Sequence, residues 1–205
     1  MPKHYLWVVG EGLKAYRPGE LIAERYQVQS FSRIVLDTQP EQKTEISEEV
    51  SDRIEAYLKL FPYRLHVPQV YAEVSPSPNN QTQKIWLLEN GPISPDGTTL
   101  LPELATEWQE AEAMRQLNWL WQITQLWEPL RVQGVASSLL NSELLRVEGP
   151  IVKILELQQD RKMPGLQQLG KLWQKWLPTA RQEIKNFLEQ LCKQMIKSEV
   201  SQTEQ

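Results

Sequence analysis

The 205-residue sequence is poor in the side chains that most often carry chemistry, with one cysteine and two histidines. A single cysteine, Cys192, excludes a disulfide framework and a cysteine-based zinc site, and His4 and His66 lie too far apart for a local metal motif. No apolar run approaches the roughly 20 residues of a membrane helix, and no signal-peptide pattern opens the chain. A net charge of −4 disfavours binding to phosphate backbones. We therefore expect a cytoplasmic protein that uses no cofactor, no metal, no nucleic acid and no membrane.

The sequence does contain enough apolar material for a globular core, because 40% of its residues are hydrophobic and eight are tryptophan. Its first half alternates short apolar runs with turns, which predicts strands. One helical pattern interrupts them and ends at Pro62. A turn cluster separates the last two strands, so they should pair as an antiparallel hairpin. The predicted strands are 5–9, 26–28, 34–36, 70–74 and 84–89, and the predicted helix is 50–61.

The second half is predicted to be mainly helical, beyond a loop rich in glycine and proline. Apolar residues recur at helical spacing in three segments, and a second hairpin turns at Glu148-Gly149-Pro150. The pattern predicts an α+β chain in three parts. These are a sheet subdomain with one helix over 1–90, a connection over 91–101, and a helical subdomain with one β-hairpin over 102–205.

This order of elements, together with several short motifs, resembles a protein kinase. Residues 134–140 (GVASSLL) match the position of the kinase catalytic loop, and residues 152–157 (VKILEL) match the strand and turn that carry the metal-binding aspartate. Residues 85–89 (IWLLE) resemble the strand that enters the hinge. The resemblance implies a two-lobe, protein-kinase-like fold in which 1–90 is the small lobe, 91–101 the hinge and 102–205 the helical lobe, incomplete at its end.

The residues at the kinase catalytic positions do not suit phosphoryl transfer, which needs a base, metal ligands and a lysine on the phosphates. Leu139 stands in the place of the base and Leu144 in the place of the metal-binding asparagine. Asp37 stands near the place of the lysine, and only Glu156 keeps a carboxylate at a metal position. The resemblance therefore implies a pseudokinase without catalytic residues.

A second resemblance is to the N-terminal region of cyanobacterial Ser/Thr phosphatases of the 2C type. It is carried by strings such as those at 5–13 (YLWVVGEGL), 17–28 (RPGELIAERYQV), 60–71 (LFPYRLHVPQVY) and 86–93 (WLLENGPI). In that family a degenerate kinase-like region precedes the phosphatase domain. The resemblance implies a regulatory or protein-interaction region of a signalling protein, and it carries over no phosphatase activity because the catalytic aspartates are absent from this sequence.

Two residues are candidates for contact with a protein partner or with a phosphatase domain. Trp119 is out of phase with the apolar residues of its predicted helix and should be exposed, whereas Trp121 and Trp127 should be in the core. Glu89 lies where the hinge would begin. Two other interpretations stay open: an atypical nucleotide-binding enzyme that uses Glu156 as a metal ligand, and a structural scaffold subunit. The oligomeric state is also open.

Overall fold

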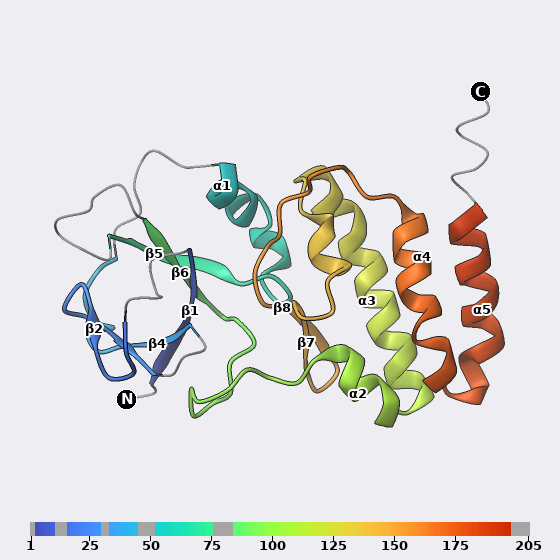
Figure 1. Ribbon diagram of the computed structural model, residues 1–205, viewed down its shortest axis with the longest axis horizontal. Helices are drawn as coiled ribbons and strands as arrows, with labels where there is room; N and C mark the ends of the chain where they lie inside the picture. Colours follow the sequence, from blue (N-terminus) through green and yellow to red (C-terminus); the bar gives the residue numbers. More distant parts are fainter. Residues whose placement is uncertain (1–2, 11–15, 30–32, 45–51, 76–83, 198–205) are drawn as a thin grey trace. The chain divides into compact units, whose positions relative to one another are not determined.

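The computed structural model describes residues 3–10, 16–29, 33–44, 52–75 and 84–197 (Figure 1). The chain divides into two compact units, Met1–Leu101 and Pro102–Gln205. The first unit holds an antiparallel sheet and the second holds most of the helices, so the α+β prediction is confirmed. Among the described residues, no helix has the length and apolar character needed to cross a membrane.

The first unit is built on a six-stranded sheet with the strand order β2-β3-β4-β1-β6-β5. Every neighbouring pair is antiparallel, including the predicted hairpin. Apolar side chains of these strands form one buried cluster, to which Leu6, Val8 and Ile85 belong. The five predicted strands are confirmed, and only the two-residue β2 was missed. The strands are β1 (His4–Val9), β2 (Leu21–Ile22), β3 (Tyr26–Val28), β4 (Ile34–Asp37), β5 (Gln69–Val74) and β6 (Ile85–Glu89).

One helix, α1 (Asp52–Lys59), packs beside β5 in the first unit, and the short 3₁₀ turn η2 (Phe61–Tyr63) follows it. Ile54, Tyr57 and Leu60 are buried at helical spacing, which explains why this segment is helical within the sheet unit. The first residues of the predicted helix fall in 45–51, outside the described part of the chain. The predicted helix is confirmed over 52–59 and ends two residues earlier than predicted.

The end of the first unit is a loop that its own polar side chains hold in shape. The carboxylate of Asp96 accepts hydrogen bonds from the hydroxyls of Ser94 and Thr98 and from the Thr98 N–H, and these bonds lower the pKa of Asp96 to about 2. Gly97 has a φ of +72°, and a Cβ at this position would overlap the ring of Tyr5. The Asp96-Gly97 pair is therefore part of a turn.

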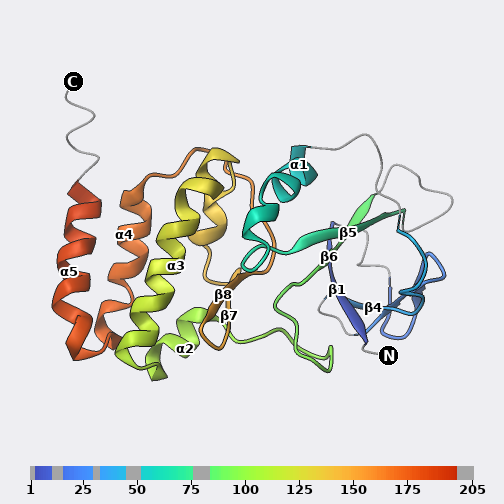
Figure 2. The same cartoon turned by 180° about the vertical axis from the view of Figure 1, so that it is seen from behind.

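The second unit consists of helices and one hairpin. Helices α3, α4 and α5 run side by side in both views of the molecule (Figures 1 and 2). Gln122 on α3 fixes the hairpin, because its amide donates to the Pro150 carbonyl at 2.8 Å and its oxygen accepts from the Val152 N–H at 2.8 Å. The elements are α2 (Leu104–Glu110), α3 (Ala113–Val132), η3 (Ala136–Leu139), β7 (Leu145–Glu148), β8 (Ile151–Ile154), α4 (Leu166–Gln174), η4 (Leu177–Thr179) and α5 (Gln182–Lys197).

Candidate functional site

Asp37, at the end of β4, forms a buried ion pair within the first unit. Its two carboxylate oxygens accept hydrogen bonds from Nε and Nη2 of Arg25, at 2.8 and 2.7 Å. The hydroxyl of Tyr71 on β5 donates to the same carboxylate at 2.7 Å. The Asp37 side chain has no exposed area, and the Arg25 guanidinium also donates to the carbonyls of Gln42 and Lys43. The carboxylate at this position is therefore committed to internal partners.

The pKa values of this cluster agree with that structural role. Burial would raise the pKa of Asp37, but the hydrogen bonds from Arg25, Tyr71 and the Gln39 N–H outweigh it and lower the pKa below its ordinary value. Burial and the hydrogen bond to Asp37 together raise the pKa of Tyr71 to about 12. At neutral pH the cluster thus contains a cation, an anion and a neutral phenol that satisfy one another.

The other three residues predicted to occupy degenerate kinase positions lie in the second unit. Leu139, in η3, and Leu144, just before β7, are both buried, with exposures of 0% and 9%. Glu156 follows β8 and is half-buried. Two hydrogen bonds join these segments: Leu155 N–H to the Leu144 carbonyl at 2.9 Å, and Gln158 N–H to the Ser138 hydroxyl at 2.8 Å. The fold brings these three positions into neighbouring segments, where two of the three side chains are apolar.

Asp160 links the same two segments, and sequence reasoning did not identify it. Its carboxylate accepts hydrogen bonds from the backbone N–H groups of Ser137 and Ala136, at 2.7 and 3.2 Å, which are the first residues of η3. Its own N–H donates to the Gly134 carbonyl at 2.8 Å. The Asp160 carboxylate thus serves as a helix cap supplied from 23 to 24 residues away. No short sequence pattern signals a cap at that separation.

The chain offers few groups that could bind a metal or act as a nucleophile. In the part that the structure describes, no three His, Cys, Asp or Glu side chains gather in a way that could hold a metal ion. Cys192 is fully buried on α5, and burial raises the pKa of its thiol to about 11. A thiol with this pKa stays protonated at neutral pH and is a poor nucleophile.

The exposure predicted for two tryptophans of α3 is wrong. Trp119, expected at the surface, is only 2% exposed, whereas Trp121, expected in the core, is 59% exposed. Trp127 is buried, as predicted, and Trp173 and Trp176 are buried as well. The physical reason is that α3 is covered on more than one side: the hairpin contacts it through Gln122, and α5 packs against it as well. The dominant apolar face of a helix does not reveal such additional contacts.

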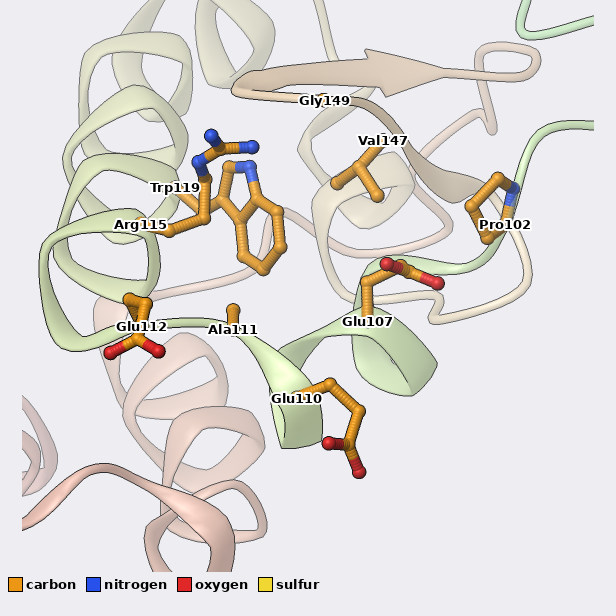
Figure 3. A pocket seen from close by; sticks show the side chains of 9 residues that line it. All are labelled: Pro102, Glu107, Glu110, Ala111, Glu112, Arg115, Trp119, Val147 and Gly149. Carbon is orange, nitrogen blue, oxygen red and sulfur yellow. The ribbon is translucent and has the colours of Figure 1, made fainter.

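Trp119 instead forms a wall of a cavity of about 260 Å³ within the second unit (Figure 3). Its indole extends from α3 between Val147 of β7 and the end of α2, and Pro102 closes another side. The short helix α2, which the sequence pattern did not predict, contributes an acidic rim. Arg181 donates to the carbonyls of Glu110 and Ala111, at 2.9 and 2.8 Å, and so fixes the end of α2 at this cavity.

The rim carries three carboxylates and one guanidinium. Glu107, Glu110 and Glu112 are all exposed, and Figure 3 shows the Glu107 carboxylate turned toward the cavity and those of Glu110 and Glu112 extending away from it. Arg115 is also exposed, and its guanidinium carbon lies 6.0 Å from the centre of the Trp119 ring. The charges beside the aromatic wall are therefore one carboxylate and one guanidinium.

Glu89, the second candidate for partner contact, belongs to the first unit. It ends β6, and its carboxylate lies 3.4 Å from Nε2 of His4, with about a third of each side chain exposed. The His4 ring in turn packs edge-on against Tyr71, with 4.7 Å between ring centres. Glu89 is accessible, but most of its surroundings are the neighbouring strands of its own sheet.

Comparison of the chain with family models, with curated proteins and with solved structures finds no match. The function of the chain therefore has to be inferred from its own residues and their geometry.

Proposed function

We propose that the chain is a non-catalytic, protein-kinase-like domain that regulates a signalling protein by binding a protein partner. The proposed setting is a cytoplasmic Ser/Thr phosphatase of the 2C type, whose phosphatase domain is one candidate partner. The proposal follows from the motif resemblance in the sequence. The α+β composition of the chain, with an antiparallel sheet in one unit and helices with a hairpin in the other, is compatible with it.

The observation that carries the proposal is the burial of leucine at the two positions where a kinase needs polar groups. Phosphoryl transfer needs a base near the incoming hydroxyl and oxygen ligands for magnesium. Leu139 and Leu144 supply neither, and both are buried in the packing of η3 and β7. Glu156 alone would leave a metal ion without its second protein ligand.

The Asp37 cluster supports the same proposal from the other unit. A kinase lysine contacts the phosphates with its positive charge. Here the neighbouring charge is negative, is fully buried and is neutralised by Arg25. Opening this cluster to admit a phosphate would separate a buried, hydrogen-bonded ion pair, so the cluster opposes phosphate binding at this position.

The test is a thermal-shift titration of the full chain with ATP and Mg²⁺. Nucleotide at about 100 times its Kd would raise the free energy of unfolding by about 2.7 kcal/mol. The proposal expects no concentration-dependent shift and no incorporation of labelled phosphate. A clear shift together with phosphate transfer that is lost in Glu156→Gln would refute it in favour of an atypical kinase-like enzyme. Glu143→Gln, a change at an exposed loop residue, is the matched control.

A further inference from the structure

Asn90, the residue that follows β6, stands directly before Gly91, and an asparagine–glycine pair occurs nowhere else in the sequence. The pair matters chemically because the backbone nitrogen after an asparagine can attack the side-chain amide, and a glycine leaves that nitrogen unshielded. Asn90 has a φ of +59°, a backbone conformation that asparagine accepts more readily than most residues. The Asn90 side chain is exposed, so water reaches the amide.

Both groups that would react lack hydrogen-bond partners among the described residues. The Asn90 amide neither donates nor accepts there, and the Gly91 N–H has no acceptor, whereas the Gly91 carbonyl accepts from the Ile93 N–H at 2.8 Å. The space beside Gly91 is open, because a Cβ built there would meet only the Cβ of Trp7, at 3.8 Å. Within the described part of the chain, no hydrogen bond therefore holds the amide and the nitrogen apart.

The other asparagines that the structure describes lack this combination. Asn118 donates its amide to a backbone carbonyl at 3.2 Å. Asn141 donates to Gln158 and accepts from the Glu143 N–H, each at 3.1 Å. Asn186 lies inside α5, where the N–H of the following residue belongs to the hydrogen-bond ladder of the helix. Of these four asparagines, only Asn90 has both a glycine after it and an unengaged amide.

The Asp96-Gly97 pair, which has the atoms to form a similar ring, is held in a protected state. The Asp96 carboxylate accepts hydrogen bonds from Ser94 and Thr98, and these bonds keep its pKa at about 2. An ionised carboxylate is a poor target for a nucleophile. The Gly97 N–H is also engaged, because it donates to the Ser94 carbonyl at 2.8 Å.

We propose that Asn90 is a site of deamidation through a succinimide. The Gly91 nitrogen gives up its proton and attacks Cγ of Asn90, so that a new C–N bond forms. The bond between Cγ and Nδ2 breaks, and Nδ2 takes up a proton from solvent and leaves as ammonia. Water then opens the succinimide at either of its two carbonyl carbons, which yields aspartate or isoaspartate. This chemistry does not depend on what the chain binds.

The modification would change both charge and backbone at the end of β6. Either product places a new carboxylate directly after Glu89, whose own carboxylate lies 3.4 Å from Nε2 of His4. Isoaspartate also routes the backbone through the side-chain methylene, immediately after the last residue that β6 pairs with β5. Deamidation therefore adds negative charge beside Glu89, one of the two predicted partner-contact residues.

The test is a tryptic peptide map of the full chain after incubation in mildly alkaline buffer, folded and in urea, with an unincubated digest as the background. Each of the four described asparagines falls on a different tryptic peptide, so mass spectrometry follows them separately. In the folded chain, the Asn90 peptide should gain the mass difference between an amide and an acid. Part of the product should be isoaspartate, which electron-transfer fragmentation identifies. The Asn118, Asn141 and Asn186 peptides should stay unchanged, and Asn141, which precedes a serine, should convert faster in urea.

Two variants test the route. Gly91→Ala adds a methyl group beside the attacking nitrogen at a position with room for it, so the fold should be kept while conversion at Asn90 becomes several times slower. Asn90→Gln keeps an amide but would need a larger ring, so its peptide should gain no mass. An Asn90 peptide that stays unmodified in the folded chain would overturn the proposal. Aspartate without isoaspartate, or an unchanged rate in Gly91→Ala, would do the same, because either result excludes the succinimide.

Discussion

The Arg25–Asp37 pair provides the sharpest test of how the first unit is held together. Both residues are buried, with exposures of 9% and 3%, and they are joined by two hydrogen bonds. Replacing either partner alone, by Arg25→Met or Asp37→Leu, leaves a buried charge without its counterion. Each single change should therefore lower the free energy of unfolding of this unit by about 3–5 kcal/mol.

The double variant should be less destabilised than either single variant, because it leaves no buried charge. Its remaining cost comes mainly from the partly buried hydroxyl of Tyr71, because Gln39, Gln42 and Lys43 are exposed residues whose backbone groups can bind water instead. Unpaired groups of this kind cost about 1–3 kcal/mol. If the double variant loses about 1–3 kcal/mol of unfolding free energy and each single variant loses about 3–5 kcal/mol, the two single losses exceed the double loss by at least about 3 kcal/mol. This difference is the coupling energy of the pair.

The assay has to read the first unit separately, since a chain of two units need not unfold in one step. Hydrogen–deuterium exchange with mass spectrometry does so through peptides that contain β3 and β4. Lys59→Met, which removes an exposed ion pair to Glu55 in the same unit, is the control and should change stability by less than about 1 kcal/mol. Additive single losses, with a coupling near zero, would refute the structural role of the pair.

The acid dependence of the same unit follows from the lowered pKa of Asp37. A carboxyl whose folded pKa lies below its ordinary value of 3.8 binds protons more weakly in the folded state than in the unfolded state. Its contribution to stability is complete above that value and is lost as the pH falls through the folded pKa. The wild type should therefore lose more stability on acidification than the Arg25→Met, Asp37→Leu double variant.

Three further changes should have distinct signatures. The pKa of Tyr71 is raised to about 12, so its contribution to the free energy of unfolding is complete below its ordinary pKa of 10.0 and is lost at higher pH. In urea denaturation at rising pH, Tyr71→Phe should therefore lose less stability than the wild type. Gly97→Ala should lower the free energy of unfolding by about 2–4 kcal/mol in the same measurement, because its φ is positive and its Cβ would overlap Tyr5. Gly19→Ala, with a φ of +92° and nothing within 4 Å of the added Cβ, should show only the smaller loss caused by backbone strain. Asp160→Ala should cost about 1–2 kcal/mol and should speed hydrogen exchange at the start of η3.

Local patterns were sufficient for most elements of this fold. Alternating apolar residues predicted the longer strands, and the turn at Glu148-Gly149-Pro150 predicted the second hairpin, where Gly149 has a φ of +56°. Helix α2 was missed because it is short, buries only Leu104 and Trp108, and has an N-cap residue, Glu103, whose side chain forms no capping hydrogen bond. A seven-residue helix has too few turns to show a periodic pattern.

Burial on α3 was harder to predict because it depends on tertiary contacts. Gln116 is fully buried, yet its amide donates to the Trp108 carbonyl at 2.7 Å and its oxygen accepts from the Arg181 N–H at 2.9 Å. These partners lie 8 and 65 residues away along the chain. A polar residue in an apolar helix looks like a solvent-facing position until its partners are known. The same reasoning explains why Trp119 and Trp121 were assigned to the wrong environments.

Two carboxylates have structural roles that the comparison of motifs did not predict. Asp37 was predicted only to stand near the place of a kinase lysine, and Asp160 was not singled out at all. In the structure Asp37 binds Arg25 from 12 residues away, and Asp160 caps η3 from 23 to 24 residues away. A carboxylate that is buried has to be satisfied by internal partners. Asp37 and Asp160 hold strands and loops together in this way, so a lysine placed at position 37 would lose the Arg25 contact and would set a second cation beside Arg25.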